Sequence, residues 1–123
     1  MRKYIPHILI ISFVFLLAVT AQVVSYAGDI KRYREAVRKN PDDAGAHCNL
    51  GDAYHELGKY KEAIESFKQA IRLDPDAAEA HLNLGLVYVF LNDRASALEQ
   101  YKILKKLDTE LANTLYDYIE DAL

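Results

Sequence analysis

The feature that most constrains this chain is an internal repeat with a period of 34 residues. When the sequence is aligned with itself at that offset, the segment Ala46 to Tyr54 (AHCNLGDAY) matches the segment Ala80 to Tyr88 (AHLNLGLVY). The agreement extends further along the chain and pairs Ala63 with Ala97, Phe67 with Tyr101, and Ala70 with Leu104. A fixed period of this length is typical of arrays in which each unit buries its apolar face against the next. The repeat therefore predicts stacked, similar units.

Within each unit the apolar residues recur at the spacing of a helix. Tyr54 follows Leu50 by one helical turn, and turn-forming pairs such as Gly58-Lys59 and Asp74-Pro75 interrupt the pattern. Gly51 and Gly85 are expected to leave room for Ala63 and Ala97 where two helices cross. We expect six helices, over Asp29 to Lys39, Ala44 to Leu57, Tyr60 to Leu73, Ala77 to Leu91, Ala95 to Leu107 and Thr109 to Ala122.

These residues resemble the tetratricopeptide-repeat (TPR) family, whose pattern is W-x2-L-G-x2-Y followed by A-x3-F, A and P. His47 and His81 stand where the family has Trp, and Thr109 replaces the closing Pro, which indicates that the array ends there. Upstream, Tyr33, Ala36 and Pro41 fit the second half of a preceding repeat. The matching residues are Leu50, Gly51, Tyr54, Ala63, Phe67, Ala70 and Pro75 in the first copy, and Leu84, Gly85, Tyr88, Ala97 and Tyr101 in the second.

The resemblance implies an all-α fold, a short right-handed TPR helical solenoid of antiparallel helix pairs with a C-terminal capping helix. The expected parts are a signal peptide or membrane anchor at 1–27, a partial repeat helix at 28–43, TPR repeats at 44–77 and 78–111, and the capping helix at 109–123. We expect Leu111, Leu115, Tyr118 and Ile119 to lie on the inner side of that last helix. The flanking helices would supply the equivalent of a third unit, which a stable solenoid needs.

The N-terminal segment has the order of a secretory signal. Arg2 and Lys3 precede an apolar run, and small residues follow it up to Ala27. We favour cleavage after Ala27; the alternative is a retained anchor, because the stretch from Ile5 to Ala27 carries no charge and is long enough to span a bilayer. The chain would then be periplasmic or exported, or anchored in the inner membrane with its domain outside the cytoplasm.

Charge and composition exclude several classes of function. Without Arg2 and Lys3, 13 of the 15 basic residues remain against 18 acidic ones, which argues against nucleic acid as a partner. Cys48 is the only cysteine, so no intramolecular disulfide can form. We find no nucleophile with a matching base and no phosphate-binding glycine loop, and we expect neither enzyme activity, cofactor nor metal. The basic run from Lys31 to Lys39 fits a membrane-surface patch or a solvated helix face.

In the TPR family the first helix of each repeat lines a concave groove, so the resemblance implies which residues face a ligand. The first copy is polar and acidic and the second is apolar, unless the neighbouring helices cover it. Lysines that clamp a C-terminal carboxylate in part of the family are replaced here by Cys48, Asp52 and Leu82, so we reject that activity. The predicted partner-binding residues are Cys48, Asn49, Asp52, His55, Glu56, Leu82, Asn83, Leu86, Val89 and Phe90.

The function expected from this groove is that of a protein–protein interaction adaptor that binds an amphipathic polypeptide segment. The alternative is a membrane-anchored structural or tethering subunit of a cell-envelope assembly, as a monomer or as a homo-oligomer. Asn49 and Asn83 have two readings, because their side chains can hydrogen-bond a bound backbone or brace adjacent helices. The partner is expected to be a protein or peptide, with membrane association through residues 1–27.

Overall fold

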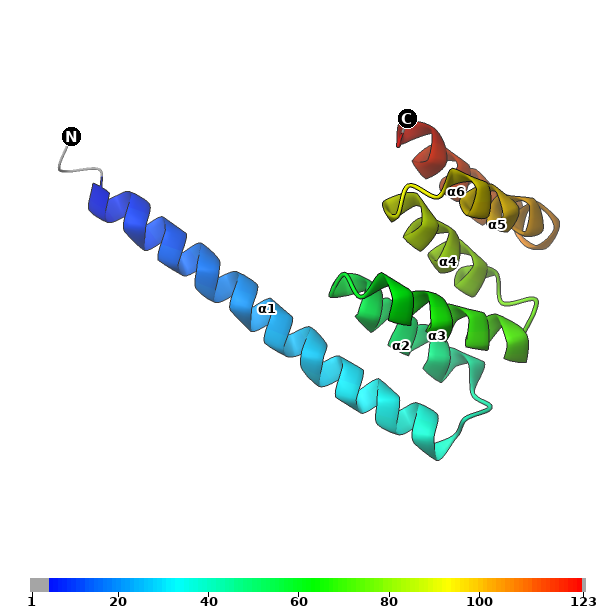
Figure 1. Cartoon of the computed structure of the whole chain (residues 1–123), viewed down its shortest axis with the longest axis horizontal. Coiled ribbons are helices and arrows are strands. Elements are labelled where there is room, and N and C mark those ends of the chain that lie inside the picture. The colour runs from blue at the N-terminus through cyan, green and yellow to red at the C-terminus, as the bar shows by residue number, and fades with distance from the viewer. Residues whose placement is uncertain (1–4, 123) are drawn as a thin grey trace.

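The structure is a computed structural model that describes residues 5–122, and over that range it is all-α. Two antiparallel hairpins, α2–α3 and α4–α5, stack through α3 and α4, and α6 packs on both α4 and α5 (Figure 1). This arrangement confirms the predicted TPR solenoid. The helices are α1 (Ile5–Lys39), α2 (Ala44–Glu56), α3 (Tyr60–Leu73), α4 (Ala78–Phe90), α5 (Arg94–Leu107) and α6 (Thr109–Asp121).

The first helix differs most from the prediction, because it starts at Ile5 and not at Asp29. It continues without a break for 35 residues, which is about 52 Å at 1.5 Å per residue. Its C-terminal part packs on α2, and its apolar part leads away from the repeats (Figure 1). Gly28 does not interrupt the helix, since a single internal glycine costs only about 1 kcal/mol relative to alanine.

The two turns inside the hairpins are built alike, as the repeat requires. Gly58 and Asn92 occupy equivalent positions and both have positive φ, at 70° and 59°. In each turn the next backbone N–H closes the helix end: Lys59 donates to the Tyr54 carbonyl at 2.9 Å, and Asp93 donates to the Tyr88 carbonyl at 2.8 Å. A helix commonly ends in this way, with a residue in the left-handed backbone region followed by this hydrogen bond. That residue is usually glycine, and asparagine is its most common replacement.

The equivalent positions of Gly51 and Gly85 have a different structural reason from the one predicted. A Cβ atom on Gly51 would lie 2.7 Å from Cε1 of Phe67, and one on Gly85 would lie 2.5 Å from Cδ2 of Leu115. The nearest atoms therefore belong to large side chains of neighbouring helices and not to Ala63 or Ala97. The glycines let these side chains reach the two cores.

Both histidines at the usual Trp positions tie their helix to the preceding turn. Nε2 of His47 lies 2.8 Å from the Pro41 carbonyl oxygen, and Nε2 of His81 lies 2.9 Å from that of Pro75. His81 is only 4% exposed, and its Nδ1 lies 2.8 Å from the Gln100 side chain. Among the described residues no buried side-chain nitrogen or oxygen lacks a partner. These histidines are therefore structural.

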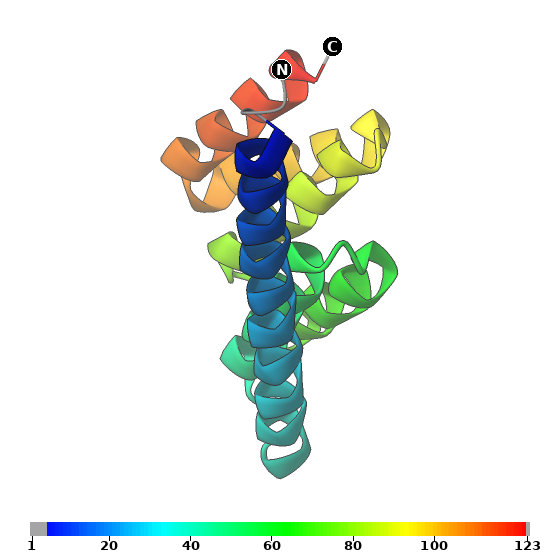
Figure 2. The same cartoon turned by 90° about the vertical axis from the view of Figure 1, so that its left-hand side faces the viewer.

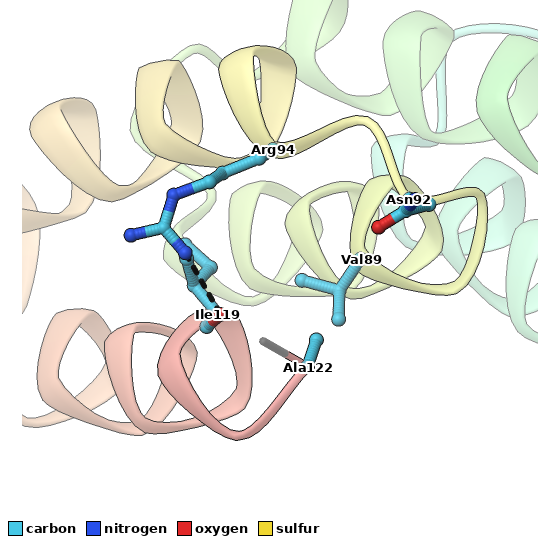
Figure 3. Close-up of a pocket in the computed structure, with 5 residues that line it drawn as sticks. All are labelled: Val89, Asn92, Arg94, Ile119 and Ala122. Carbon is cyan, nitrogen blue, oxygen red and sulfur yellow. Dashed lines mark hydrogen bonds between the residues drawn. The ribbon is translucent and has the colours of Figure 1, made fainter.

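The C-terminal helix closes the second repeat. Leu115 and Ile119 are buried as predicted, but Tyr118 is 53% exposed, because it is one residue and about 100° from Ile119 around the helix. Arg94 of α5 donates to the Ile119 carbonyl at 3.2 Å and pairs with Glu120 at 2.8 Å. Figure 3 shows Arg94 reaching over the end of α6, where Val89, Asn92, Arg94, Ile119 and Ala122 line a small hollow. A cation at this end satisfies carbonyls that the helix leaves unpaired.

Candidate interaction groove

The groove was predicted on α2 and α4, and in the structure α1 forms a third wall. Tyr26, Asp29 and Tyr33 of α1 face Asn49, Asp52, Ala53 and Glu56 of α2 across a hollow. In Figure 2 α1 crosses in front of the repeats, which agrees with its place as a wall of this hollow. We call the hollow, together with the adjoining side chains of α4, the groove.

The α1 wall is the part that sequence reasoning missed. Tyr26, Asp29 and Tyr33 are spaced by three and four residues, which places them on one face of a helix. That signal was present in the sequence. It was overlooked because a domain boundary at Ala27 separated Tyr26 from the other two residues.

The polar half of the groove is centred on Asp52. Its carboxylate accepts a hydrogen bond from Nδ2 of Asn83 at 2.9 Å, which joins α2 to α4. Asn83 therefore braces adjacent helices, one of its two predicted roles. Partial desolvation of its carboxylate by the surrounding protein, and then the charges of Glu56 and Glu79, raise the pKa of Asp52 from 3.8 to about 6. The side chain is still exposed to solvent, so a basic ligand can reach it.

Two other residues of the predicted site also have shifted pKa values, although neither lines the hollow between α1 and α2. Burial, followed by the negative charges of Asp52 and Glu79, raises the pKa of the Cys48 thiol to about 11. Cys48 is thus a protonated, unreactive thiol at neutral pH. Burial lowers the pKa of His55, so its neutral form is favoured. Among residues 5–122 no three His, Cys, Asp or Glu side chains group closely enough to hold a metal ion.

The apolar half of the groove is less open than expected. Leu82, Leu86 and Val89 are half-buried and pack against the core cluster that α5 and α6 form around Leu115. The C-terminal helix therefore covers much of the apolar stripe on α4. Phe90 is the exception, since it is 64% exposed.

Phe90 belongs to an aromatic cluster at the end of the groove. Its ring meets the His55 ring edge-on, with 5.0 Å between centroids, and lies nearly parallel to the Tyr60 ring at 6.1 Å. Tyr60 was not predicted as a site residue, although its place directly after the Gly58-Lys59 turn puts it beside the end of α2. The three rings join the C-terminal ends of α2 and α4 at one edge of the domain.

The apolar part of α1 is exposed along its length. Within residues 5–122 one helix, α1 from Pro6 to Lys39, is long and apolar enough to cross a membrane. No residue in its most apolar 18-residue stretch is buried. A signal sequence near an N-terminus has the same properties. The stretch is therefore compatible with a signal or an anchor.

Sequence comparison decides the family. A model described as "TPR repeat" matches residues 25–58 and 51–92, and a model described as "Tetratricopeptide repeat" matches residues 78–110. The chain belongs to the tetratricopeptide-repeat family. No curated protein sequence matches this TPR chain.

Solved structures similar to this TPR chain include domains bound to peptides. The second TPR domain of human RPAP3 with an HSP70 peptide has a TM-score of 0.71 at 26% identity, covering 77% of this chain and 81% of that one. The TPR2B domain of yeast Sti1 in its pHsp70 complex has a TM-score of 0.74 at 24% identity, covering 81% and 86%, and shows the fold alone. The MamA AMB-1 structure has a TM-score of 0.65 at 30% identity. The match covers 71% of this chain and 51% of the MamA chain.

Proposed function

We propose that this TPR chain is a protein-interaction adaptor that binds a polypeptide segment in the groove between α1, α2 and α4. The observation that carries the proposal is the hollow in which tyrosines and carboxylates of α1 and α2 face one another. Membership of a family of interaction modules supports the general role, and nothing in the comparisons points to an enzyme.

The chemistry of the groove favours a basic, amphipathic segment. Asp52 and Glu56 present carboxylates, and the ring of Tyr26 offers a face on which an Arg or Lys side chain can lie. The Tyr33 ring already holds the guanidinium of Arg32, 4.8 Å from its centroid. The exposed parts of the half-buried Leu82, Leu86 and Val89 are the apolar surface that α4 leaves for such a segment. Such charges mainly set the orientation and association rate of a ligand, and buried apolar contacts supply most of its affinity.

The same charges argue against the ligands of the peptide-bound neighbours. The HSP70 peptide in the human RPAP3 structure, SGPTIEEVD, carries acidic residues. In this chain the opposing surface holds Asp52 and Glu56, so an acidic peptide would be repelled. The proposed partner therefore differs in charge from those peptides.

The proposal is tested by purifying the tagged chain from membranes, identifying the co-purifying polypeptide and titrating the segment that binds. Asp52→Lys should slow association strongly at low salt and less at high salt, since salt screens the charge. Glu65→Lys is the matched control, because Glu65 is an exposed acidic residue of α3 outside the groove. Equal effects of the two substitutions would reject the groove as the binding surface.

We also propose that α1 stays on the mature chain and holds the adaptor at a membrane, with the domain outside the cytoplasm. Two observations favour this tethering role over release. The helix runs unbroken through Ser25, Tyr26 and Ala27, and Tyr26 forms part of the groove wall. Cleavage after Ala27 would remove that side chain from the site.

A further inference from the structure

The register of α1 against α2 fixes where the repeats lie along the apolar helix. Tyr26 of α1 lies beside Glu56 at the end of α2, and a second hollow joins Glu56 and Leu57 to α1 residues between Phe15 and Tyr26. The stretch from Ile5 to Ala27 is free of charge and about 34 Å long at 1.5 Å per residue, close to the thickness of a bilayer core. Helix α2 therefore ends beside the C-terminal part of the charge-free stretch of α1.

Helices α4 and α6 end on the same side of the domain as α2. The rings of His55 and Phe90 bring the ends of α2 and α4 together, and Val89 and Ala122 line one hollow that joins the ends of α4 and α6. In Figure 1 both hairpin turns and the end of α6 lie on the side of the domain that faces the apolar half of α1.

This edge has the composition of a protein surface at a lipid headgroup layer. Phe90 is 64% exposed and Leu91 is 45% exposed, and Lys59 and Tyr60 lie beside them. Aromatic rings and lysines gather at this depth because one end of the side chain is apolar and the other is wet. We call Lys59, Tyr60, Phe90 and Leu91 the aromatic edge.

The opposite edge of the domain has the reverse character. The turns there carry Asp42, Asp43, Asp74, Asp76 and Asp108, and no apolar residue of that group of turns is among the exposed large ones. Lys31 and Arg34 line a face of α1 between the two edges, just beyond its charge-free stretch, at the depth where basic side chains meet anionic headgroups. The domain thus has the aromatic edge on the side of the apolar part of α1 and acidic turns on the opposite side.

We infer that the aromatic edge rests in the headgroup region of the bilayer that holds α1. The lipid surface covers Phe90 and Leu91, and the domain is held against the membrane instead of swinging freely on its helix. The inference rests on the proposed retention of α1 and adds a second lipid contact to it. A groove held in this way has its end, at His55 and Glu56, close to the membrane surface.

Tryptophan fluorescence tests this inference directly, because the chain contains no Trp. Three single-Trp variants of the full chain are reconstituted in phosphatidylcholine–phosphatidylglycerol vesicles whose acyl chains are unbrominated, brominated near the headgroup, or brominated near the chain end. Phe90→Trp should shift its emission to the blue and lose most of its intensity in brominated vesicles. Asp76→Trp, on the opposite edge, should keep the emission of a water-exposed ring.

Phe15→Trp, in the apolar part of α1, separates the two ways in which the inference can fail. If the emission of Phe15→Trp is quenched and that of Phe90→Trp is not, α1 is embedded but the edge is off the membrane, and the lipid contact is wrong. If neither variant is quenched, retention in the membrane fails as well. A loss of affinity for the groove ligand in Phe90→Ala, without quenching in Phe90→Trp, would assign Phe90 to the polypeptide and overturn the lipid contact.

Discussion

At the scale of single residues, Asp52 concentrates the electrostatics of the groove. It accepts a hydrogen bond from Asn83 and lies near two further carboxylates, those of Glu56 and Glu79. The hydrogen bond holds α2 to α4, and the neighbouring charges oppose the ionised form. A residue of the proposed binding surface is thus also a site where stability is lost, a trade-off that is common at functional sites.

The raised pKa of Asp52 predicts a pH dependence of stability. The unfolded chain ionises this group near pH 3.8 and the folded chain near pH 6, so the folded state holds the extra proton between these values. Stability from this group is therefore lost as the pH rises through that window. Asp52→Asn should raise the free energy of unfolding at pH 7 by roughly 1 kcal/mol, after allowance for solvent screening.

Urea unfolding of the wild type and Asp52→Asn at pH 4 and pH 7 checks this prediction. The difference between the two proteins should be larger at pH 7. Asp42→Asn, in the turn before α2, serves as the matched control. A constant difference across the range would mean that Asp52 does not titrate as described.

The two repeat glycines give a second residue-scale prediction. Gly51→Ala would press a methyl group against the Phe67 ring and should cost about 1 to 3 kcal/mol of unfolding free energy. Gly28→Ala adds the same methyl group where no atom lies within 4 Å, so it should be neutral or stabilising. Thermal unfolding of both variants is the measurement, and equal melting temperatures would contradict the described packing.

At the scale of helices, the sequence predicted the positions of five elements to within one or two residues. Period, apolar spacing and turn residues such as Gly58 and Pro75 are local signals, and local signals set helix ends. The contacts between helices were harder to predict. The partner of Gly85 proved to be Leu115, because the rotation of α6 against α4 depends on the packing of the whole second core.

The last helix, α6, carries a buried and an exposed large side chain whose contributions to stability can be compared. Leu115→Ala removes a fully buried side chain and should lower the free energy of unfolding by about 2 to 5 kcal/mol. Tyr118→Ala removes a larger side chain from the same helix, yet it should cost less than about 1 kcal/mol because Tyr118 is exposed. Chemical unfolding followed by circular dichroism compares the two. A larger loss in Tyr118→Ala would restore the sequence-based assignment of this residue to the core.

At the scale of the whole molecule, the main question is how the apolar helix and the repeats act together. The sequence analysis divided them at Ala27, whereas the structure has one helix that is apolar on one side of this point and packed on α2 on the other. The boundary was predicted there because a basic pair, an apolar run and small residues form the pattern of a cleavable signal peptide, and a retained anchor shares the first two of these features. The α1 wall of the groove could not be predicted once that boundary was drawn.

Retention of α1 predicts a definite mass. The mature chain should keep its first 27 residues and should be released from membranes by detergent but not by high salt. Intact-mass spectrometry of the native protein, together with extraction at high salt and in detergent, provides the check. A mature N-terminus at Gly28 in the soluble fraction would instead support the cleaved, exported form.

The central claim is that the groove between α1, α2 and α4 binds a polypeptide, and site-specific photocrosslinking in cells tests it most directly. A photoreactive amino acid replaces Asn49, which lines the groove, or Glu65, which is exposed on α3 outside it. We expect one discrete crosslinked polypeptide at position 49, none at position 65, and loss of the product when Asp52→Lys is added. Crosslinks at position 65 alone, or a product at position 49 that is insensitive to Asp52→Lys, would contradict it.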